Sequence, residues 1–102
     1  MYAGRRVLLV GLGVLGSELL RDLEGAGATV VVVLDDRFAE IVGEPRLVGP
    51  VSGLGEALDE YDVDLLVIGA SLIASERINW VTRHARSRNL PVYVAPERSE
   101  ID

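Results

Sequence analysis

The chain has 102 residues, no cysteine, one histidine, ten arginines and no lysine, and its formal net charge is −6. This length fits one domain, and the missing cysteine excludes disulfides, thiolate nucleophiles and cysteine-based metal sites. The missing lysine excludes Schiff-base chemistry, and the acidic balance argues against binding of nucleic acid or of an anionic membrane. We therefore expect no catalytic residue and no metal site in this chain.

Three segments with clear periodicity open the chain. Arg6 to Val10 is a short Val and Leu run closed by glycine, and it predicts a strand buried on both faces. Val14 to about Gly25 carries leucines at helical spacing and predicts a helix. Ala28 to Leu34 contains four consecutive valines and predicts a second strand, which Asp35 and Asp36 end.

The segment after the second predicted strand has little hydrophobic periodicity, and clear periodicity returns after residue 53. Glycines and prolines divide residues 37–52, which predicts a loop with a short strand around Arg46 to Val48. Leu54 to Tyr61 has apolar residues at helical spacing and predicts a helix with an acidic outer face. Leu65 to Ile68 predicts a strand that Gly69 closes.

The last two elements complete the pattern. Ser75 is a candidate N-cap for a helix to about Arg88, and Leu90 to Ala95 predicts a final strand, placed at an edge because it contains Pro91. The alternation of strands and helices predicts an α/β fold, a doubly wound parallel five-stranded sheet of order 3-2-1-4-5, Rossmann-like. We expect residues 1–102 to be a single nucleotide-binding domain and part of a larger protein. No apolar run approaches the length of a membrane helix, and no signal-peptide cleavage pattern follows the N-terminus, so we expect a cytoplasmic protein.

A glycine motif lies between the first strand and the first helix. Gly11, Gly13 and Gly16 form a GxGxxG, in which the glycines permit a tight turn, close backbone approach to a diphosphate and close helix packing. The helix N-terminus would offer the backbone amides of Val14, Leu15 and Gly16 to an anion. The motif therefore predicts binding of a dinucleotide.

A second group of predicted site residues follows the second and fourth strands. Asp35 is placed to accept hydrogen bonds from ribose hydroxyls and to repel a 2′-phosphate, which favours NAD over NADP. Asp36 follows Asp35 in the sequence. Arg37 weakens the preference for NAD, since a guanidinium can bind a phosphate or stack on adenine. The other lip of the cleft is predicted from three consecutive residues, Gly69, Ala70 and Ser71. The alternative is that the glycines only build a turn and the aspartates only cap a loop.

Two aromatic side chains lie on the third predicted helix. His84 has no partner in the sequence that suggests catalysis, and we assign it no role. A core stripe through Ile78, Val81 and Ala85 leaves Trp80 away from its centre. An exposed Trp80 would suit contact with a second copy or with an adjoining catalytic domain. The alternative is a rotated helix with Trp80 partly buried.

The order of motifs resembles a known family. The segments VLLVGLGVLGSELLRDL, VVVLDDR, LVGPVSGLGEALDEYDVDLLVIGAS and NLPVYVAPE are similar to the N-terminal nucleotide-binding domain of bacterial nucleotide-sugar epimerases or dehydratases and of polyprenyl glycosylphosphotransferases. That family serves polysaccharide biosynthesis and binds NAD or CoA. The resemblance implies dinucleotide contacts by the motif glycines and Asp35, with Ser71 close by, and sugar chemistry in a separate domain. Redox-sensing repressors that bind NADH have similar halves.

Three functions follow from these observations. The first is an NAD(H)-binding module without turnover of its own, with NADP and CoA as alternative ligands. The second is the cofactor half of a nucleotide-sugar epimerase or dehydratase, and the third is an interaction module whose nucleotide site is unused.

Overall fold

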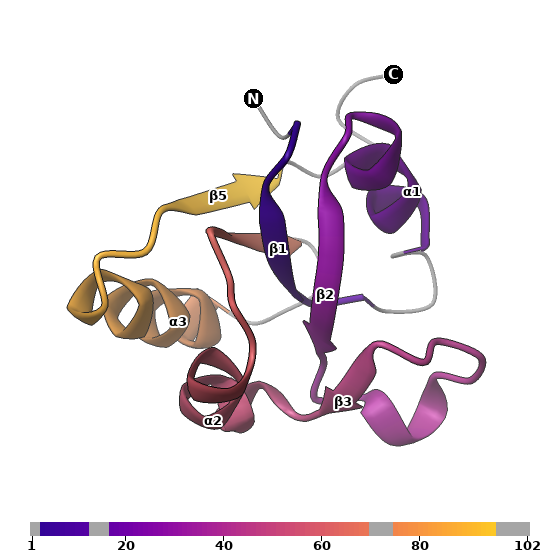
Figure 1. Cartoon of the computed structure of the whole chain (residues 1–102). Helices are drawn as coiled ribbons and strands as arrows, with labels where there is room; N and C mark the ends of the chain where they lie inside the picture. The colour runs from indigo at the N-terminus through magenta and orange to yellow at the C-terminus, as the bar shows by residue number, and fades with distance from the viewer. Residues whose placement is uncertain (1–2, 13–16, 70–74, 96–102) are drawn as a thin grey trace.

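The computed structural model describes residues 3–12, 17–69 and 75–95. Within these ranges strands and helices alternate, as Figure 1 shows by label and colour. The strands are β1 Arg6–Val10, β2 Thr29–Leu34, β3 Leu47–Gly49, β4 Leu65–Gly69 and β5 Val92–Ala95. The α-helices are α1 Ser17–Gly25, α2 Leu54–Glu60 and α3 Ser75–Ser87, and two 3₁₀ turns are η1 Phe38–Glu40 and η2 Val51–Gly53.

The strands form one sheet in the order β3-β2-β1-β4-β5, and every neighbouring pair is parallel. This confirms the predicted α/β, Rossmann-like fold and its strand order. The central strands β1 and β4 are buried along almost their whole length. Their sequences are continuous apolar runs because a parallel sheet covered on both faces offers no solvated side.

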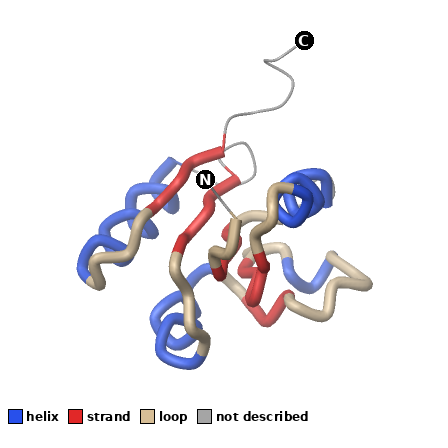
Figure 2. The backbone as a smooth tube through the Cα atoms, turned by 45° about the horizontal axis from the view of Figure 1, so that its top comes forward, coloured by secondary structure: helices blue, strands red, loops and turns tan. Residues whose placement is uncertain are grey.

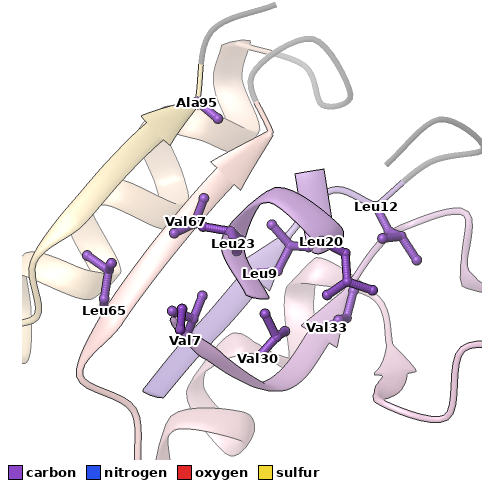
Figure 3. Packing of buried hydrophobic residues seen from close by; sticks show 11 residues of the cluster. Val7, Leu9, Leu12, Leu20, Leu23, Val30, Val33, Leu65, Val67 and Ala95 are labelled. Atoms are coloured by element: carbon purple, nitrogen blue, oxygen red, sulfur yellow. The ribbon is translucent and has the colours of Figure 1, made fainter. Parts of the chain in front are cut away.

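Helix α1 covers one face of the sheet. Its Leu20 and Leu23 pack on Val7 and Leu9 of β1 and on residues of β2 and β4, as Figure 3 shows from close by. Burial of each such Val or Leu side chain contributes about 1.5–3 kcal/mol. This cluster, which we call the α1-side core, also includes Leu12, two residues beyond the end of β1.

Helices α2 and α3 cover the opposite face, and Figure 2 shows helices on both sides of the strand layer. Leu54 of α2 and Val81 and Ala85 of α3 are fully or almost fully buried against the sheet. Together with the inward side chains of β1, β2 and β4 they form the α3-side core. The two cores explain why β1, beyond the exposed Arg6 at its start, and β4 carry no polar residue.

A bulge in β2 decides which core each of its later residues meets. Val7 pairs with Val30, whereas the next residue of β1, Leu8, pairs with Val32, so that Val31 is the extra residue. Beyond it, Val33 belongs to the α1-side core and Leu34 to the α3-side core. Because side chains alternate along a strand, the residue after Leu34 turns to the α1 side.

The ends of several elements differ slightly from the predicted ones. The first residues of the helix predicted from Val14 lie outside the described residues, and the described part of α1 ends at Gly25 as predicted. Ser75, predicted as an N-cap, is the first residue of α3. Strand β5 begins at Val92, directly after Pro91, and occupies the predicted edge of the sheet.

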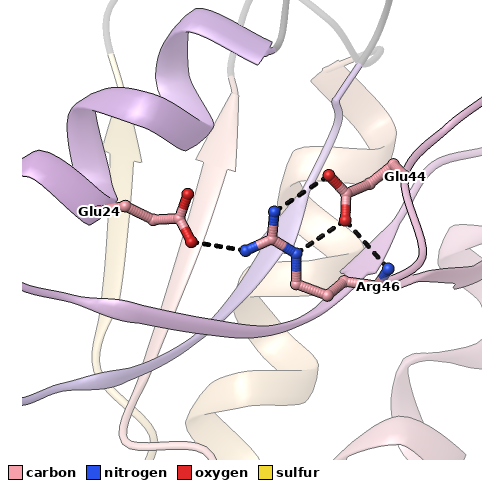
Figure 4. Close-up of polar contacts among 3 residues, drawn as sticks. All are labelled: Glu24, Glu44 and Arg46. Carbon is pink, nitrogen blue, oxygen red and sulfur yellow. Dashed lines mark hydrogen bonds and ion pairs between the residues drawn. The ribbon is translucent and has the colours of Figure 1, made fainter.

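Arg46 ties the segment 37–52 to α1. Arg46 donates from Nε and one terminal nitrogen to the Glu44 carboxylate at 2.7 and 3.1 Å and from the other terminal nitrogen to Glu24 of α1 at 2.6 Å (Figure 4). Its backbone amide also donates to Glu44 at 3.0 Å. Strand β3 begins one residue later than predicted, at Leu47, and the arginine ties its start to α1. The predicted short strand is otherwise confirmed.

We expect Glu44→Gln to lower the free energy of unfolding by about 1–2 kcal/mol at pH 7, because the bidentate hydrogen bonds to Arg46 lose their charge. Hydrogen bonding from Arg46 lowers the pKa of Glu44 from its ordinary value of 4.5. Its contribution is therefore complete above that value and disappears as the pH falls through the lower folded-state pKa. Urea unfolding between pH 7 and pH 3 measures the difference.

Glu40→Gln is the matched control, because Glu40 pairs with Arg37 where both side chains are more than half exposed. We expect it to cost about 0.5 kcal/mol or less. A Glu44→Gln effect that stays constant down to acidic pH would contradict the assigned ion pair.

Candidate functional site

The candidate site lies at the carboxyl ends of β1 and β4. These strands are neighbours in the sheet, with Val10 paired to Ile68, yet the chain leaves β1 toward α1 on one face and β4 toward α3 on the other. In doubly wound sheets ligands bind where the connections diverge in this way. Gly11 directly follows β1 and Gly69 ends β4, so the structure brings these two predicted residues to adjacent strand ends.

Gly11 makes the sharp turn that the motif requires of its first glycine. Its φ is +89°, a conformation that disfavours a side chain, and its amide donates to the Leu34 carbonyl at 2.8 Å. It is buried, and the following Leu12 packs into the α1-side core. The turn therefore extends the β1–β2 pairing by one hydrogen bond and then directs the chain away from the sheet.

Asp35 is the one buried charged residue in the part of the chain that the structure describes, with 2% of its surface exposed. Its Oδ2 accepts the backbone N–H of Leu12 at 2.7 Å, and its Oδ1 accepts that of Arg37, also at 2.7 Å. The carboxylate therefore joins the end of β2 to the glycine-rich turn after β1. These two hydrogen bonds explain why a charged side chain is tolerated at a position that faces the α1-side core.

This geometry gives Asp35 a structural role beside the predicted ribose contact. A carboxylate has about four acceptor positions, so two backbone amides leave acceptor capacity on both oxygens. At 2% exposure, however, a ribose hydroxyl reaches these oxygens only after the side chain becomes more accessible. The described geometry thus shows Asp35 holding the turn, and a ribose contact stays a prediction.

Asp36 and Arg37 do not join Asp35 in one cluster. Asp36 accepts the Val51 amide at 3.0 Å through Oδ1 and the Arg77 Nε at 3.1 Å through Oδ2. Arg37 forms an exposed ion pair with Glu40 at 3.3 Å, which raises the pKa of its guanidinium. Asp36 therefore ties β2 to the start of α3, and Arg37 is turned along η1.

Six predicted contacts lie outside the described residues: Gly13, Val14, Leu15, Gly16, Ala70 and Ser71. One residue at the rim was not predicted, Arg77 in the first turn of α3. Its position could have been inferred, because a helix that follows β4 begins at the same edge of the sheet as the end of β2. A basic residue in that turn is within reach of the double Asp.

Trp80 and His84 form an aromatic pair on α3. Trp80 is partly buried against the α3-side core, and its ring lies 5.3 Å from that of His84. The Arg77 guanidinium lies 5.9 Å from the Trp80 ring, and a side chain at Gly55 of α2 would come within 3.3 Å of the His84 Nε2. Of the two alternatives for Trp80, the structure therefore shows the partly buried one. A partner at the Trp80 face stays a prediction.

Two further properties concern the described residues. No helix among them is long and apolar enough to cross a membrane. No group of three or more His, Asp or Glu in the described ranges is arranged to hold a metal ion.

Comparison with known proteins adds no relative. No protein-family model matches the chain, and neither a curated protein nor a solved structure does so. The family resemblance of the sequence motifs therefore stays a prediction, while the Rossmann-like fold rests on the sheet order itself.

Proposed function

We propose that this chain is a dinucleotide-binding module that holds NAD or NADH across the carboxyl ends of β1 and β4. One observation carries the proposal: a glycine at φ +89° directly follows β1 at the point where the connections of a 3-2-1-4-5 sheet diverge. This is where the fold presents backbone amides to a diphosphate. The fold class and the described glycines fit such a ligand.

The residues divide into three proposed roles. Backbone amides in the 13–16 segment would bind the diphosphate, and Gly69 with the two residues after it would line the nicotinamide side. Asp35 would act mainly as a positioning residue, because its bond to the Leu12 amide fixes the turn that leads into the motif. A bound nicotinamide cofactor would supply hydride transfer. This chain would bind and orient that cofactor.

The proposed preference for NAD over NADP rests on charge. Asp35 and Asp36 both lie at the end of β2, where an adenosine 2′-phosphate would be placed. Arg37 is engaged with Glu40 in the described structure, which reduces its value as a phosphate partner. CoA, whose adenosine carries a 3′-phosphate, is the alternative ligand that the sequence resemblance implies.

The wider role proposed is a cofactor-holding part of an enzyme of nucleotide-sugar or polysaccharide biosynthesis. The chain supplies no lysine or cysteine, and its one histidine packs against Gly55 and Trp80. We therefore propose that the acid and base groups of such an enzyme come from another domain or protein.

A second candidate is an interaction module that binds no nucleotide. It is favoured by one observation, the engagement of both Asp35 oxygens with the chain's own backbone. The two candidates differ in a simple measurement, because only the first predicts a saturable heat of binding.

Calorimetric titration with NAD, NADH, NADP and CoA tests the proposal. We expect saturable binding of NAD or NADH, weaker binding of NADP, and a rise in the free energy of unfolding of about 2.7 kcal/mol at a ligand concentration of 100 times Kd. Binding of none of the four would overturn the proposal in favour of the second candidate, and equal binding of NADP would contradict the assigned selectivity.

A bulky residue at the predicted lip provides the matched variant. Ser71→Tyr is expected to weaken NAD binding at least about tenfold, or 1.4 kcal/mol. Ser87→Tyr is the control, because Ser87 is exposed at the far end of α3. Equal binding by both variants would contradict a site at the carboxyl edge.

A further inference from the structure

Among the residues that the structure describes, the outer edge of β5 has no backbone hydrogen-bond partner. Within these residues β5 pairs with β4, and the Pro91 carbonyl accepts the Leu66 amide at 3.0 Å. Because successive residues of a strand direct their backbone groups to opposite sides, Val92 and Val94 direct theirs outward. An edge of this kind accepts an added strand.

The same residues place apolar surface on the α3 side of that edge. The Val92 side chain packs against the α3-side core, and Val94, two residues later, is on the same face. Val94 is 43% exposed, an unusual position for a Val beside a buried sheet. The aliphatic stems of an added strand's α3-facing side chains would find apolar contact there, in addition to the hydrogen bonds of its backbone.

The flank of α3 that lies toward this edge is basic and hollowed. Four polar residues spaced along one side of the helix line an open hollow of about 410 Å³, namely Asn79, Thr82, Arg83 and Arg86. On the opposite flank Arg77 contacts Asp36 after β2, and His84 contacts α2, as does Arg88 just beyond the end of the helix. Since α2 occupies that other side, the hollow lies on the side of the helix that faces the β5 edge, and Figure 2 shows α3 running alongside this strand.

Charge selects the partner of this surface. Arg83 and Arg86 form no ion pair within the described ranges, whereas Arg46, Arg77 and Arg88 each pair with a carboxylate. Two uncompensated arginines one helical turn apart are a local cationic site in a chain of net charge −6. The cationic flank fits a carboxylate-bearing partner.

We propose that β5 binds an extended acidic peptide segment as a sixth strand, with carboxylates on its α3-facing side paired to Arg83 and Arg86. Alternate residues of a strand repeat every 6.5–7 Å or so, and one helical turn rises about 5.4 Å, so two acidic residues at i and i+2 reach both guanidinium groups. A second copy fits less well. Two-fold pairing of β5 with β5 would bring the two basic flanks together, and like charges repel.

A fluorescein-labelled peptide of sequence TEVEVET is the probe, with TKVKVKT as the charge control and TEVEVET N-methylated at its third and fourth residues as the backbone control. We expect saturable anisotropy with the first peptide alone, because N-methylation removes ladder donors without changing the charge, and lysine reverses the charge. In amide spectra of the intact chain, Val92 and Val94 should shift most. Binding of a control peptide with equal affinity, or absence of these shifts, would overturn strand addition.

Matched charge reversals separate a specific site from general attraction. Arg83→Glu with Arg86→Glu is expected to weaken the peptide at least about tenfold. Arg5→Glu with Arg21→Glu makes the same change of net charge at exposed residues that form no ion pair within the described ranges. Equal loss in both double variants, no binding of the first peptide, or self-association of the chain through β5 in sedimentation would overturn the proposal. Its outcome is independent of the nucleotide titration, which reports on the carboxyl ends of β1 and β4.

Discussion

Replacing Asp35 with asparagine is expected to lower the free energy of unfolding by about 2–4 kcal/mol. The carboxylate accepts one backbone amide on each oxygen, from Leu12 and from Arg37. Asparagine has one carbonyl oxygen and one NH₂ group, so in either orientation its NH₂ faces a backbone N–H. The loss of size is negligible, which isolates the hydrogen bonds as the cause. Urea unfolding at neutral pH gives the difference directly.

Asp36→Asn is the control for this variant, because it removes the same charge one residue later. Its oxygen can still accept the Val51 amide, and the lost ion pair with Arg77 is 40% and 43% exposed at its two side chains. We expect a cost of about 1 kcal/mol or less. Equal effects of the two variants would show that the Asp35 bonds do not hold the turn. Because an Asp35 variant is expected to be less stable, a loss of NAD binding in it is interpreted together with its free energy of unfolding.

Replacing Gly11 with alanine is the second large effect, with an expected cost of about 1–3 kcal/mol. At φ +89° an L side chain is strained, and the residue is buried with its amide bonded to the Leu34 carbonyl. Relief of the strain would rotate the start of the glycine-rich connection away from β2. We therefore expect weaker NAD binding as well as a lower urea midpoint.

Gly25→Ala is the matched glycine substitution, at the last residue of α1 with no atom within 4 Å of the added Cβ. Because alanine favours helix more than glycine does, we expect this variant to be neutral or up to about 1 kcal/mol more stable. Should Gly11→Ala behave in the same way, the turn would not depend on glycine.

Much of the fold could be predicted from the chain alone. The apolar runs of β1, β2 and β4 are long enough and rich enough in branched residues to identify buried parallel strands. The segments between these strands are long enough to hold crossover helices. Because such crossovers are right-handed, few strand orders are then possible. The β2 bulge at Val31 was beyond such reasoning, because four consecutive valines carry no signal of which one is extra.

The candidate site was less predictable because its key side chain serves two purposes. A carboxylate after β2 has the same sequence signature whether it binds ribose or the chain's own amides. The bulge turns Asp35 to the α1 side, where the Leu12 amide lies within 2.7 Å, and no spacing rule gives that contact. Trp80 shows the same limit, since helical spacing places it away from the centre of the core stripe and yet its side chain is partly buried.

Mapping of backbone amide shifts during titration with NAD tests the central claim most directly. The account predicts the largest changes at the carboxyl edge, at Gly11, Leu12 and Gly69, with little change at Ala28 or Asn89 at the opposite edge. Saturating shifts centred on any other surface, or unchanged amides at the ends of β1 and β4, would contradict it.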